Sequence, residues 1–503
     1  MSLLGIDVGT SGCKAGAFSS DGRLIAQAAR TYPTLRRQPG YVELDSQEVW
    51  QKVQAVIAEV AAQTTSDPVT ALCTGSIGEA VVPVTADRRI LRDSILFVDR
   101  RGSEYADALM RDWGQERVFE INPNLIGPQY SLPKLLWMRD HEPDLYAAAD
   151  RFLLWGDLVG YLLGCDPFAS SALANRTLLF DLDRNDWSDD LLAWSGIYRR
   201  QLGKVVSGGT VVGSVSPGIA RDLGLPPGVQ VVAGGHDQCM NALGCGAVSP
   251  GQVIIGAGTF ECLTPVYRKP AEKGRMLAAR LNIEHHVIPD LYVSFLFNEG
   301  GSLVTWFRQA FAPNEPGDSQ EIYDRLAAEM PVDPTRLLVL PHFDVPAWPR
   351  YIPDTGGMIV GLRTTTTRGD ILKAIMEGVT LYFVEGLLAL RDQGITINEF
   401  IASGGGARSD PWLQIKADIY GVPVVRPHHT EAGLTGAAML AGLGTGIYAT
   451  PAEAAAVFVR KDRSFEPNPA RHDIYQERTA LFSGLYDRNR ETLRMLREAT
   501  LAG

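Results

Sequence analysis

The sequence lacks a long apolar run, closely paired cysteines and clustered positive charge, and each absence excludes a class of protein. Its most apolar stretch, residues 152–165, is short and interrupted by Asp157, which predicts a buried helix rather than a membrane span. The six cysteines show no Cys-x-x-Cys spacing, so we expect reduced thiols. No signal peptide precedes the first predicted strand, and we therefore expect a cytoplasmic protein.

The charge balance limits the partners of the chain. A formal net charge of -11, with no long run of lysine and arginine, argues against nucleic acid and against an anionic membrane surface. We expect neither as a partner, so any polyphosphate ligand must be bound by local donors. The 503 residues are enough for two or three domains, each with a sizeable core.

Residues 3–18 form an apolar run, a turn of small polar residues and a second apolar run, which predicts a β-hairpin. At its tip, backbone N–H groups and the hydroxyls of Thr10 and Ser11 can donate to phosphate oxygens, and Lys14 adds positive charge. Asp7 would repel a phosphate unless a cation lay between them, so it indicates Mg²⁺, held directly or through water. On its own, such a motif is more often an ordinary hairpin turn.

A second copy of this pattern lies half a chain away. Residues 253–264 repeat the plan of strand, Gly-x-Gly-Thr and strand, with Gly258 and Thr259 at the turn. Two hairpins of like design suggest a duplicated domain, in which each copy contacts the same phosphate chain from opposite sides of a cleft. Neither glycine cluster has the spacing of a Rossmann or Walker motif.

Polar residues follow two predicted strands in the first half. The strand at residues 69–75 leads to Ser76 and Glu79, and the strand at 94–98 leads to Asp99 and Arg100. A carboxylate accepts hydroxyl protons and an arginine donates in a fixed fork, so such strand ends suit a hydroxyl-rich ligand. A surface ion pair explains the Asp99 cluster equally well.

A central carboxylate follows the short apolar strand at residues 229–233. Two glycines indicate a close approach of the backbone to some other group, and Asp237 is then exposed at the strand end. Phosphoryl transfer to an alcohol needs a base for the hydroxyl proton, and we predict Asp237 for this role. Gln238 can bond a substrate hydroxyl. His236 is the alternative base, although packing explains it more simply.

Together these motifs resemble the FGGY carbohydrate kinase family, which is part of the actin-like and hexokinase-like ATPase superfamily. The resemblance covers almost the whole chain and rests on Asp7-x-Gly-Thr with Lys14, Asp99-Arg100-Arg101, Pro133-Lys134-Leu135-Leu136-Trp137, Gly234-Gly235-His236-Asp237-Gln238 and Gly404-Gly405-Gly406. It implies an α/β fold of two duplicated ribonuclease H-like domains with a central cleft. Residues 1–247 would bind sugar, and residues 248–503 would bind nucleotide.

The resemblance also implies ATP and Mg²⁺ as cofactors. Three successive glycines between a predicted strand and a capped helix permit an adenine ring to lie on the backbone. In this motif Gly405 and Ser409 stand at the positions that contact adenosine in similar kinases. Gly301 and Thr305 stand at positions that approach the nucleotide.

The implied reaction is transfer of the γ-phosphoryl group to a hydroxyl of a small sugar. A ketopentose such as xylulose is the first expectation, and a polyol such as glycerol, a tetritol or a pentitol is the second. The motif pattern is mixed, because residues 76–78 lack the histidine of pentulose kinases, and of the Arg-Glu pair of glycerol kinases only Glu79 is present. Gly78 leaves space that a larger substrate or another side chain must fill.

Two further readings stay open at this point. The chain could be an actin-like ATPase that uses nucleotide as a conformational switch, or a sugar sensor that binds without turnover. A homodimer is also left open.

Overall fold

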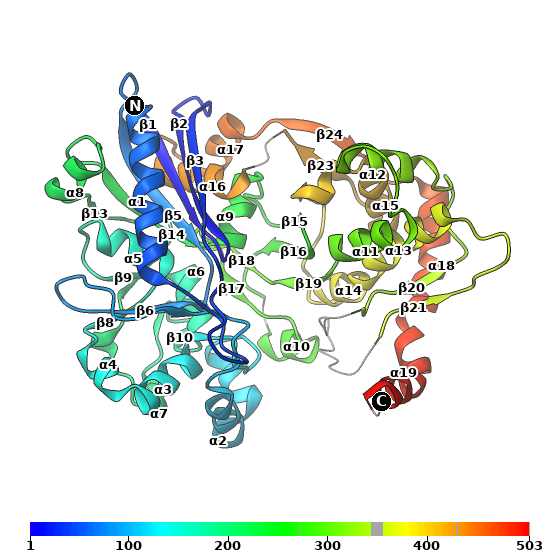
Figure 1. Ribbon diagram of the computed structural model, residues 1–503, viewed down its shortest axis with the longest axis horizontal. Helices are drawn as coiled ribbons and strands as arrows, with labels where there is room; N and C mark the ends of the chain where they lie inside the picture. Colours follow the sequence, from blue (N-terminus) through cyan, green and yellow to red (C-terminus); the bar gives the residue numbers. More distant parts are fainter. Residues whose placement is uncertain (271, 344–355, 429–430, 502–503) are drawn as a thin grey trace. The chain divides into compact units, whose positions relative to one another are not determined.

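The computed structural model describes residues 1–270, 272–343, 356–428 and 431–501, which fold into two compact units (Figure 1). The first unit contains residues 1–249, 282–293 and 431–460. The second contains the described residues of 250–281, 294–430 and 461–503. The domain boundary expected between residues 247 and 248 stays a prediction. None of the helices in the described ranges combines the length and apolar character that a membrane crossing requires.

The first unit is built on a mixed sheet with the strand order β13-β14-β5-β1-β2-β3. Strands β1, β5 and β14 run parallel, whereas β2, β3 and β13 pair antiparallel with their neighbours. The predicted N-terminal hairpin is confirmed by the pairing of β1 with β2. The strands are β1 (Ser2–Val8), β2 (Gly12–Ser19), β3 (Leu24–Thr31), β5 (Val69–Ser76), β13 (Val211–Ser214) and β14 (Gln230–His236).

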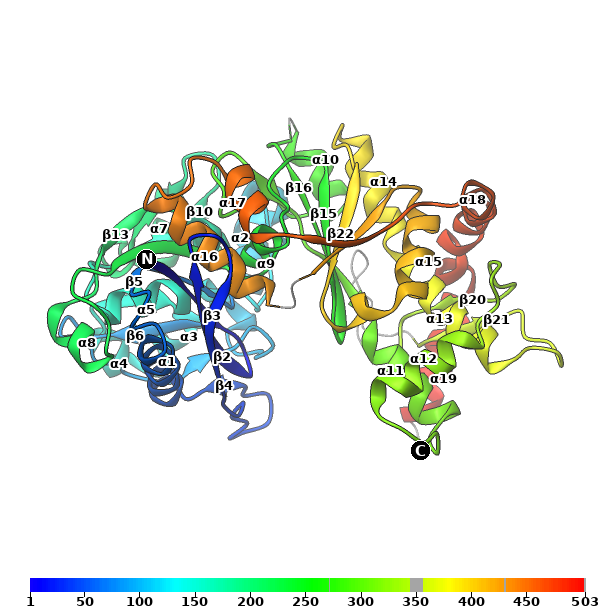
Figure 2. The ribbon, with the colours of Figure 1, turned by 90° about the horizontal axis from the view of Figure 1, so that it is seen from above.

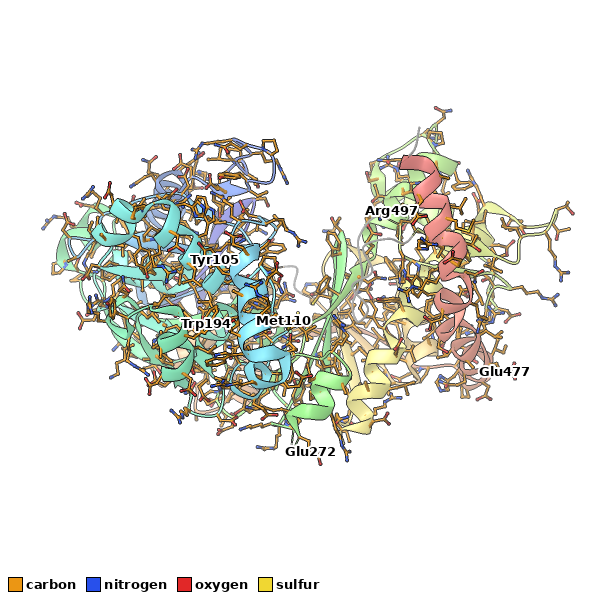
Figure 3. The ribbon with its side chains drawn as sticks, turned by 90° about the horizontal axis from the view of Figure 1, so that it is seen from below. Tyr105, Met110, Trp194, Glu272, Glu477 and Arg497 are labelled. Carbon is orange, nitrogen blue, oxygen red and sulfur yellow. The ribbon has the colours of Figure 1, made fainter. Side chains whose placement is uncertain are left out.

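Helices α1, α5, α9 and α16 pack against the strands of this sheet. Residues of α2, α3 and α7 share a second hydrophobic core and form a separate helical region. In that region Tyr105 of α2 donates a hydrogen bond to Asp140 of α3 at 2.7 Å, and Trp194 of α7 donates to Asp112 of α2 at 3.0 Å. Figure 3 labels Tyr105 and Trp194. The helices are α1 (Ser46–Ala62), α2 (Ser103–Ile121), α3 (Ser131–His141), α5 (Trp155–Leu162), α7 (Asp189–Ser195), α9 (Asp237–Gly244), α16 (Ala432–Gly444) and α17 (Pro451–Phe458).

The two faces of β1 meet different helices, and this decides the position of Asp7. Ile6 and its alternate neighbours are buried in one core with side chains of α1 and α5. Because side chains alternate along a strand, Gly5 and Asp7 lie on the opposite face, against α16. A Cβ at Gly5 would lie 2.2 Å from the Leu434 carbonyl oxygen, so only glycine permits this close approach.

The segment 431–460 joins the first unit although most of the second unit precedes it in the sequence. Its helices α16 and α17, orange in Figure 2, lie with the strands of the first unit. Helix α16 packs against α9 through glycines, since a Cβ at Gly244 would lie 1.8 Å from the Ala432 carbonyl oxygen and one at Gly436 would lie 2.0 Å from that of Met240. Small residues therefore hold α16 in place.

The second unit repeats the sheet of the first. Its strands run in the order β19-β16-β15-β22-β23-β24, in which β15 is parallel to β22, β22 is parallel to β23, and the other pairs are antiparallel. This order corresponds strand for strand to β3-β2-β1-β5-β14-β13 of the first unit, so the predicted duplicated α/β architecture is confirmed. The strands are β15 (Gln252–Ala257), β16 (Phe260–Tyr267), β19 (Leu296–Glu299), β22 (Glu399–Ser403), β23 (Val424–Pro427) and β24 (Lys461–Phe465).

The helices of the second unit include α11 (Gly301–Phe311), α12 (Ser319–Ala328), α13 (Arg368–Tyr382), α14 (Val384–Asp392), α15 (Asp410–Tyr420), α18 (Pro469–Ser483) and α19 (Leu485–Leu501). Residues of α11, α12, α13 and α15 line its cavity.

Candidate active site

The hairpin tip of the first unit places a carboxylate and an amine side by side. Asp7 and Lys14 are register partners in β1 and β2, and Lys14 Nζ donates to a Glu431 carboxylate oxygen at 2.7 Å. Burial raises the pKa of Asp7 to about 6, Lys14 acts to lower this pKa, and Glu431 acts to raise it. Of the two predicted phosphate-binding hydroxyls, Thr10 is half-buried and Ser11 is exposed at the tip.

A second carboxylate, Asp237, lies at the junction of β14 and α9, as the sequence predicts. The surrounding protein removes most of its hydration, although 31% of its side chain stays accessible. Burial first, and then the negative charges of Asp7 and Glu79, raise the pKa of Asp237 to about 7. A base with a pKa near neutrality is suited to accept a hydroxyl proton at physiological pH. Gln238 follows it, half-buried, in the first turn of α9.

The alternative base, His236, lies directly before Asp237, and its surroundings favour the packing explanation. His236 is buried, its pKa is lowered well below the usual range by burial and by the charge of Arg176, and its Nε2 lies 3.4 Å from Asp237 Oδ1. A neutral imidazole therefore forms one wall beside the carboxylate.

The glycine pair before His236 allows other segments of the chain to approach the backbone closely. A Cβ at Gly234 would lie 2.0 Å from the Thr74 carbonyl oxygen, and one at Gly235 would lie 2.4 Å from the Val287 side chain. The close approach expected at this pair thus exists, and its partners are β5 and residue 287.

Glu79 belongs to the same charge cluster as Asp237. Its side chain is buried and forms an ion pair with Arg176, which also pairs with Glu284 at 2.6 Å. Burial raises the pKa of Glu79, while Arg176 acts to lower it. The backbone of Glu79 has a φ of 60°, an uncommon left-handed conformation that clusters at functional sites, and Ser131 donates a hydrogen bond to its carbonyl oxygen at 2.7 Å.

Sequence reasoning missed Arg176 and Glu284. Arg176 lies in the single turn Asn175–Thr177, within a stretch where we predicted no site residue. Glu284 lies in the segment 282–293. Neither residue stands in a glycine-rich turn or directly after a long apolar strand, so no local signal marked them.

The remaining predicted substrate residues have other surroundings. Asp99 is fully buried, and its carboxylate accepts hydrogen bonds from the Val42 backbone at 2.7 Å and from the Arg101 guanidinium at 2.6 Å. Ser76 Oγ is buried and accepts a hydrogen bond from the Gly156 backbone at 2.8 Å. Arg100 is exposed. These contacts occupy the Asp99 carboxylate and Ser76 Oγ, although Ser76 is the register partner of His236, directly before Asp237. The substrate-binding role of these three residues stays a prediction.

The second unit contains a cavity of about 280 Å³ where the predicted nucleotide residues converge. Every nucleotide-binding residue predicted in the second half lines it, namely Gly258, Thr259, Gly301, Thr305, Gly405 and Ser409. Val304, Leu372, Met376 and Trp412 add apolar walls. A Cβ at Gly405 would meet no atom within 4 Å, so this glycine faces open space, as a surface for a flat ring requires. The shape and lining suit a nucleoside.

A buried ion pair supports one wall of this cavity. Lys416 Nζ lies 2.5 Å from a Glu261 carboxylate oxygen, and both side chains are almost completely buried. The same ammonium lies 4.7 Å from the ring centre of Trp412, which lines the cavity. The sequence alone did not single out this pair.

The residues around Asp7 fit a magnesium ion of the kind that accompanies a nucleotide. Among the described residues no group of three or more His, Cys, Asp or Glu is arranged as a metal site. Mg²⁺ at a nucleotide commonly uses only one or two carboxylates, together with water and phosphate oxygens. A half-buried carboxylate such as Asp7, whose pKa is raised and near which Glu431 adds negative charge, is a position that a cation would stabilise.

Comparison with known proteins identifies the family of each half. Residues 2–244 match the model of the FGGY family of carbohydrate kinases, N-terminal domain, and residues 253–445 match that of the C-terminal domain. The xylulose kinase of Bacillus subtilis is 28% identical over 492 residues, which are 97% of each chain. The glycerol kinase of Methylibium petroleiphilum is 31% identical over 488 residues, covering 93% of this chain and 95% of the relative.

A solved structure gives the same result for the fold. The crystal structure of xylulose kinase from Rhodospirillum rubrum superposes with a TM-score of 0.90 at 27% sequence identity, covering 98% of this chain and 100% of the other.

Proposed function

Because the chain belongs to the FGGY family of carbohydrate kinases, which are ATP-dependent, we propose that it phosphorylates a hydroxyl of a ketopentose such as xylulose. The observation that carries the proposal is Asp237, an accessible carboxylate whose pKa is raised to about 7 beside Glu79. The similarity to xylulose kinases over nearly the full length supports the choice of a ketopentose.

The reaction assigns a distinct task to each residue. Asp237 accepts the proton of the substrate hydroxyl as that oxygen attacks the γ-phosphorus of ATP, and the bond from this phosphorus to the β,γ-bridging oxygen breaks, so that ADP leaves. Glu79 and Gln238 hold neighbouring hydroxyls, because a carboxylate accepts and an amide both donates and accepts. Phosphoryl transfer needs little covalent help from the protein, so positioning and charge are the main contributions of these side chains.

The nucleotide is assigned to the cavity of the second unit. The adenosine would lie against Gly405 with Ser409 at its edge, and the loop of Gly258 and Thr259 would donate to phosphate oxygens. In the first unit Thr10, Ser11 and Lys14 would contribute further donors and charge. Asp7 would hold Mg²⁺ directly or through water, and the ion would neutralise charge on the phosphates.

A polyol kinase is the second candidate. The glycerol kinase relative shares slightly more identity with the chain than the xylulose kinase does, and this observation favours glycerol or a longer polyol as the acceptor. Membership in a family of carbohydrate kinases argues against a non-sugar ATPase switch.

A coupled assay of ADP release over a panel of acceptors tests the proposal. The panel contains D-xylulose and other ketopentoses, pentitols, tetritols and glycerol, each with ATP and Mg²⁺. We expect the highest kcat/KM with a ketopentose. A clear preference for glycerol or another polyol would replace the first candidate with the second, and sugar binding without ADP release would overturn the kinase assignment.

A further inference from the structure

Position 78 is a glycine, yet the space beside it is occupied. A Cβ at Gly78 would lie 3.0 Å from Arg176 Cγ, 3.3 Å from Arg176 Nε and 3.1 Å from His236 Cδ2. The side chain of Arg176 therefore stands where a side chain at position 78 would extend. The space that the sequence leaves open at Gly78 is thus filled from a turn almost a hundred residues further along the chain.

Arg176 is held rigidly at this position. Its guanidinium forms ion pairs with Glu79 and Glu284, and its central carbon lies 5.2 Å from the ring centre of Tyr130. Asn282 donates a hydrogen bond to Glu284 at 2.7 Å, so the acidic partner is itself fixed. A planar guanidinium between two carboxylates has its orientation determined by both partners.

The same group lies close to the predicted base. The charge of Arg176 acts to lower the pKa of Asp237 and of His236. The His236 ring lies beside both sites, since its Cδ2 is 3.1 Å from the ideal Cβ position of residue 78 and its Nε2 is 3.4 Å from Asp237 Oδ1. Arg176 retains 15% exposure and Asp237 retains 31%, so both reach accessible space. The charges of Arg176 and Glu79 thus both act on the carboxylate that would receive the substrate proton.

We propose that Arg176 is a specificity-determining and positioning residue of the substrate site, which limits the space beside Asp237 and holds Glu79 as the acceptor for a substrate hydroxyl. This inference rests on the proposed kinase function. It predicts that the arginine acts on the sugar and has no effect on the nucleotide, whose cavity is lined by other residues.

The test compares Arg176→Lys, Arg176→Ala and the double variant Arg176→Ala with Gly78→Arg, and Arg184→Ala is the matched control. Arg184 is an arginine of the same region with 69% exposure and two ion pairs, to Asp181 at 3.6 Å and to Asp189 at 4.0 Å. Lysine keeps the positive charge but lacks the paired N–H donors of the guanidinium. The double variant places the arginine at position 78, which lies beside the Arg176 side chain in the fold. Steady-state KM values for the best wild-type acceptor and for ATP are measured together with melting temperatures.

We expect Arg176→Lys to raise the sugar KM about tenfold and Arg176→Ala to lower kcat/KM for sugar about a hundredfold, as for loss of a hydrogen bond to a charged group. The KM for ATP should stay within about twofold in Arg176→Lys. The kcat/KM for sugar of the double variant should be about tenfold higher than that of Arg176→Ala. Arg184→Ala should match wild type.

If the alanine variants fail to fold, the sugar KM of Arg176→Lys alone tests the proposal. The proposal is overturned if Arg176→Lys has a wild-type sugar KM, if sugar and ATP KM values rise together with a lower melting temperature, or if a folded double variant is no better than Arg176→Ala. Wild-type activity on a polyol alone would refute the ketopentose assignment and still leave these comparisons valid. A wild type that turns over no member of the panel would refute both.

Discussion

Replacing Asp237 with asparagine is expected to stabilise the folded chain at neutral pH while it removes kinase activity. The substitution keeps the shape of the side chain and deletes a negative charge that lies near Asp7 and Glu79. An uncompensated carboxylate in such surroundings costs stability, and groups of this kind are retained where function requires them.

The size of the effect follows from the pKa of Asp237. It rises from 3.8 to about 7 on folding, so between these pH values the folded chain binds more protons than the unfolded chain. Stability therefore falls as pH rises from about 4 to about 7. The two pKa values differ by about three pH units, which corresponds to about 4 kcal/mol. Because nearly a third of the side chain is accessible, we halve this figure to about 2 kcal/mol for screening.

Urea unfolding of wild type and Asp237→Asn from pH 4 to pH 8, without nucleotide or sugar, measures this difference. We expect nearly equal stability at pH 4 and a gain of about 2 kcal/mol for the variant above pH 7. Turnover should fall on the order of a hundredfold or more, since asparagine cannot accept the proton. Asp107→Asn, an exposed position on α2, should change neither quantity. A stability gain that is the same at pH 4 and pH 8, or unchanged turnover, would refute the reasoning.

Three other substitutions test the nucleotide cavity, the buried ion pair of the second unit and the contact between β1 and α16. Gly405→Val places a side chain in open cavity space, so we expect the KM for ATP to rise at least about tenfold in steady-state assays while the melting temperature and sugar KM stay unchanged. Lys416→Met leaves Glu261 as a buried unpaired charge, which should cost about 3–5 kcal/mol in chemical denaturation, and adding Glu261→Gln should recover most of this loss. Gly5→Ala forces a methyl group against the Leu434 backbone, and it should lower stability by about 1–3 kcal/mol in the same assay.

The features that the sequence predicted well depend on neighbouring residues in the chain. Each hairpin is predicted by two apolar runs on either side of a glycine-containing turn, and both hairpins are present in the structure. The six nucleotide residues of the second half line one cavity, and five of them stand at or next to a strand or helix terminus, where short motifs are informative. Thr305 lies one turn into α11. Asp237 was found for the same reason, at the end of a buried strand.

The features that escaped prediction depend on contacts between distant segments. The partner of Glu79 is Arg176, and the partner of Arg176 is Glu284, more than a hundred residues away in sequence. Asp99 stands at a strand end like Glu79, but its oxygens are engaged by Val42 and Arg101. Two strand-end carboxylates can look alike in sequence, and only the fold shows that one pairs with the nearby Arg101 and the other with the distant Arg176.

The duplicated sheet carries different chemistry in its two copies, and one register position shows why. Asp7 is the penultimate residue of β1 and pairs with Lys14, whereas the penultimate residue of β15 is Gly256, which pairs with Cys262. The first hairpin therefore carries a carboxylate and an ammonium near its tip, and the second carries neither at those positions. The acidic group of the second hairpin, Glu261, is instead buried against Lys416. The two sheets therefore share a strand order but differ in chemistry, because the first unit contains Asp7 and Asp237 and the second contains the open cavity.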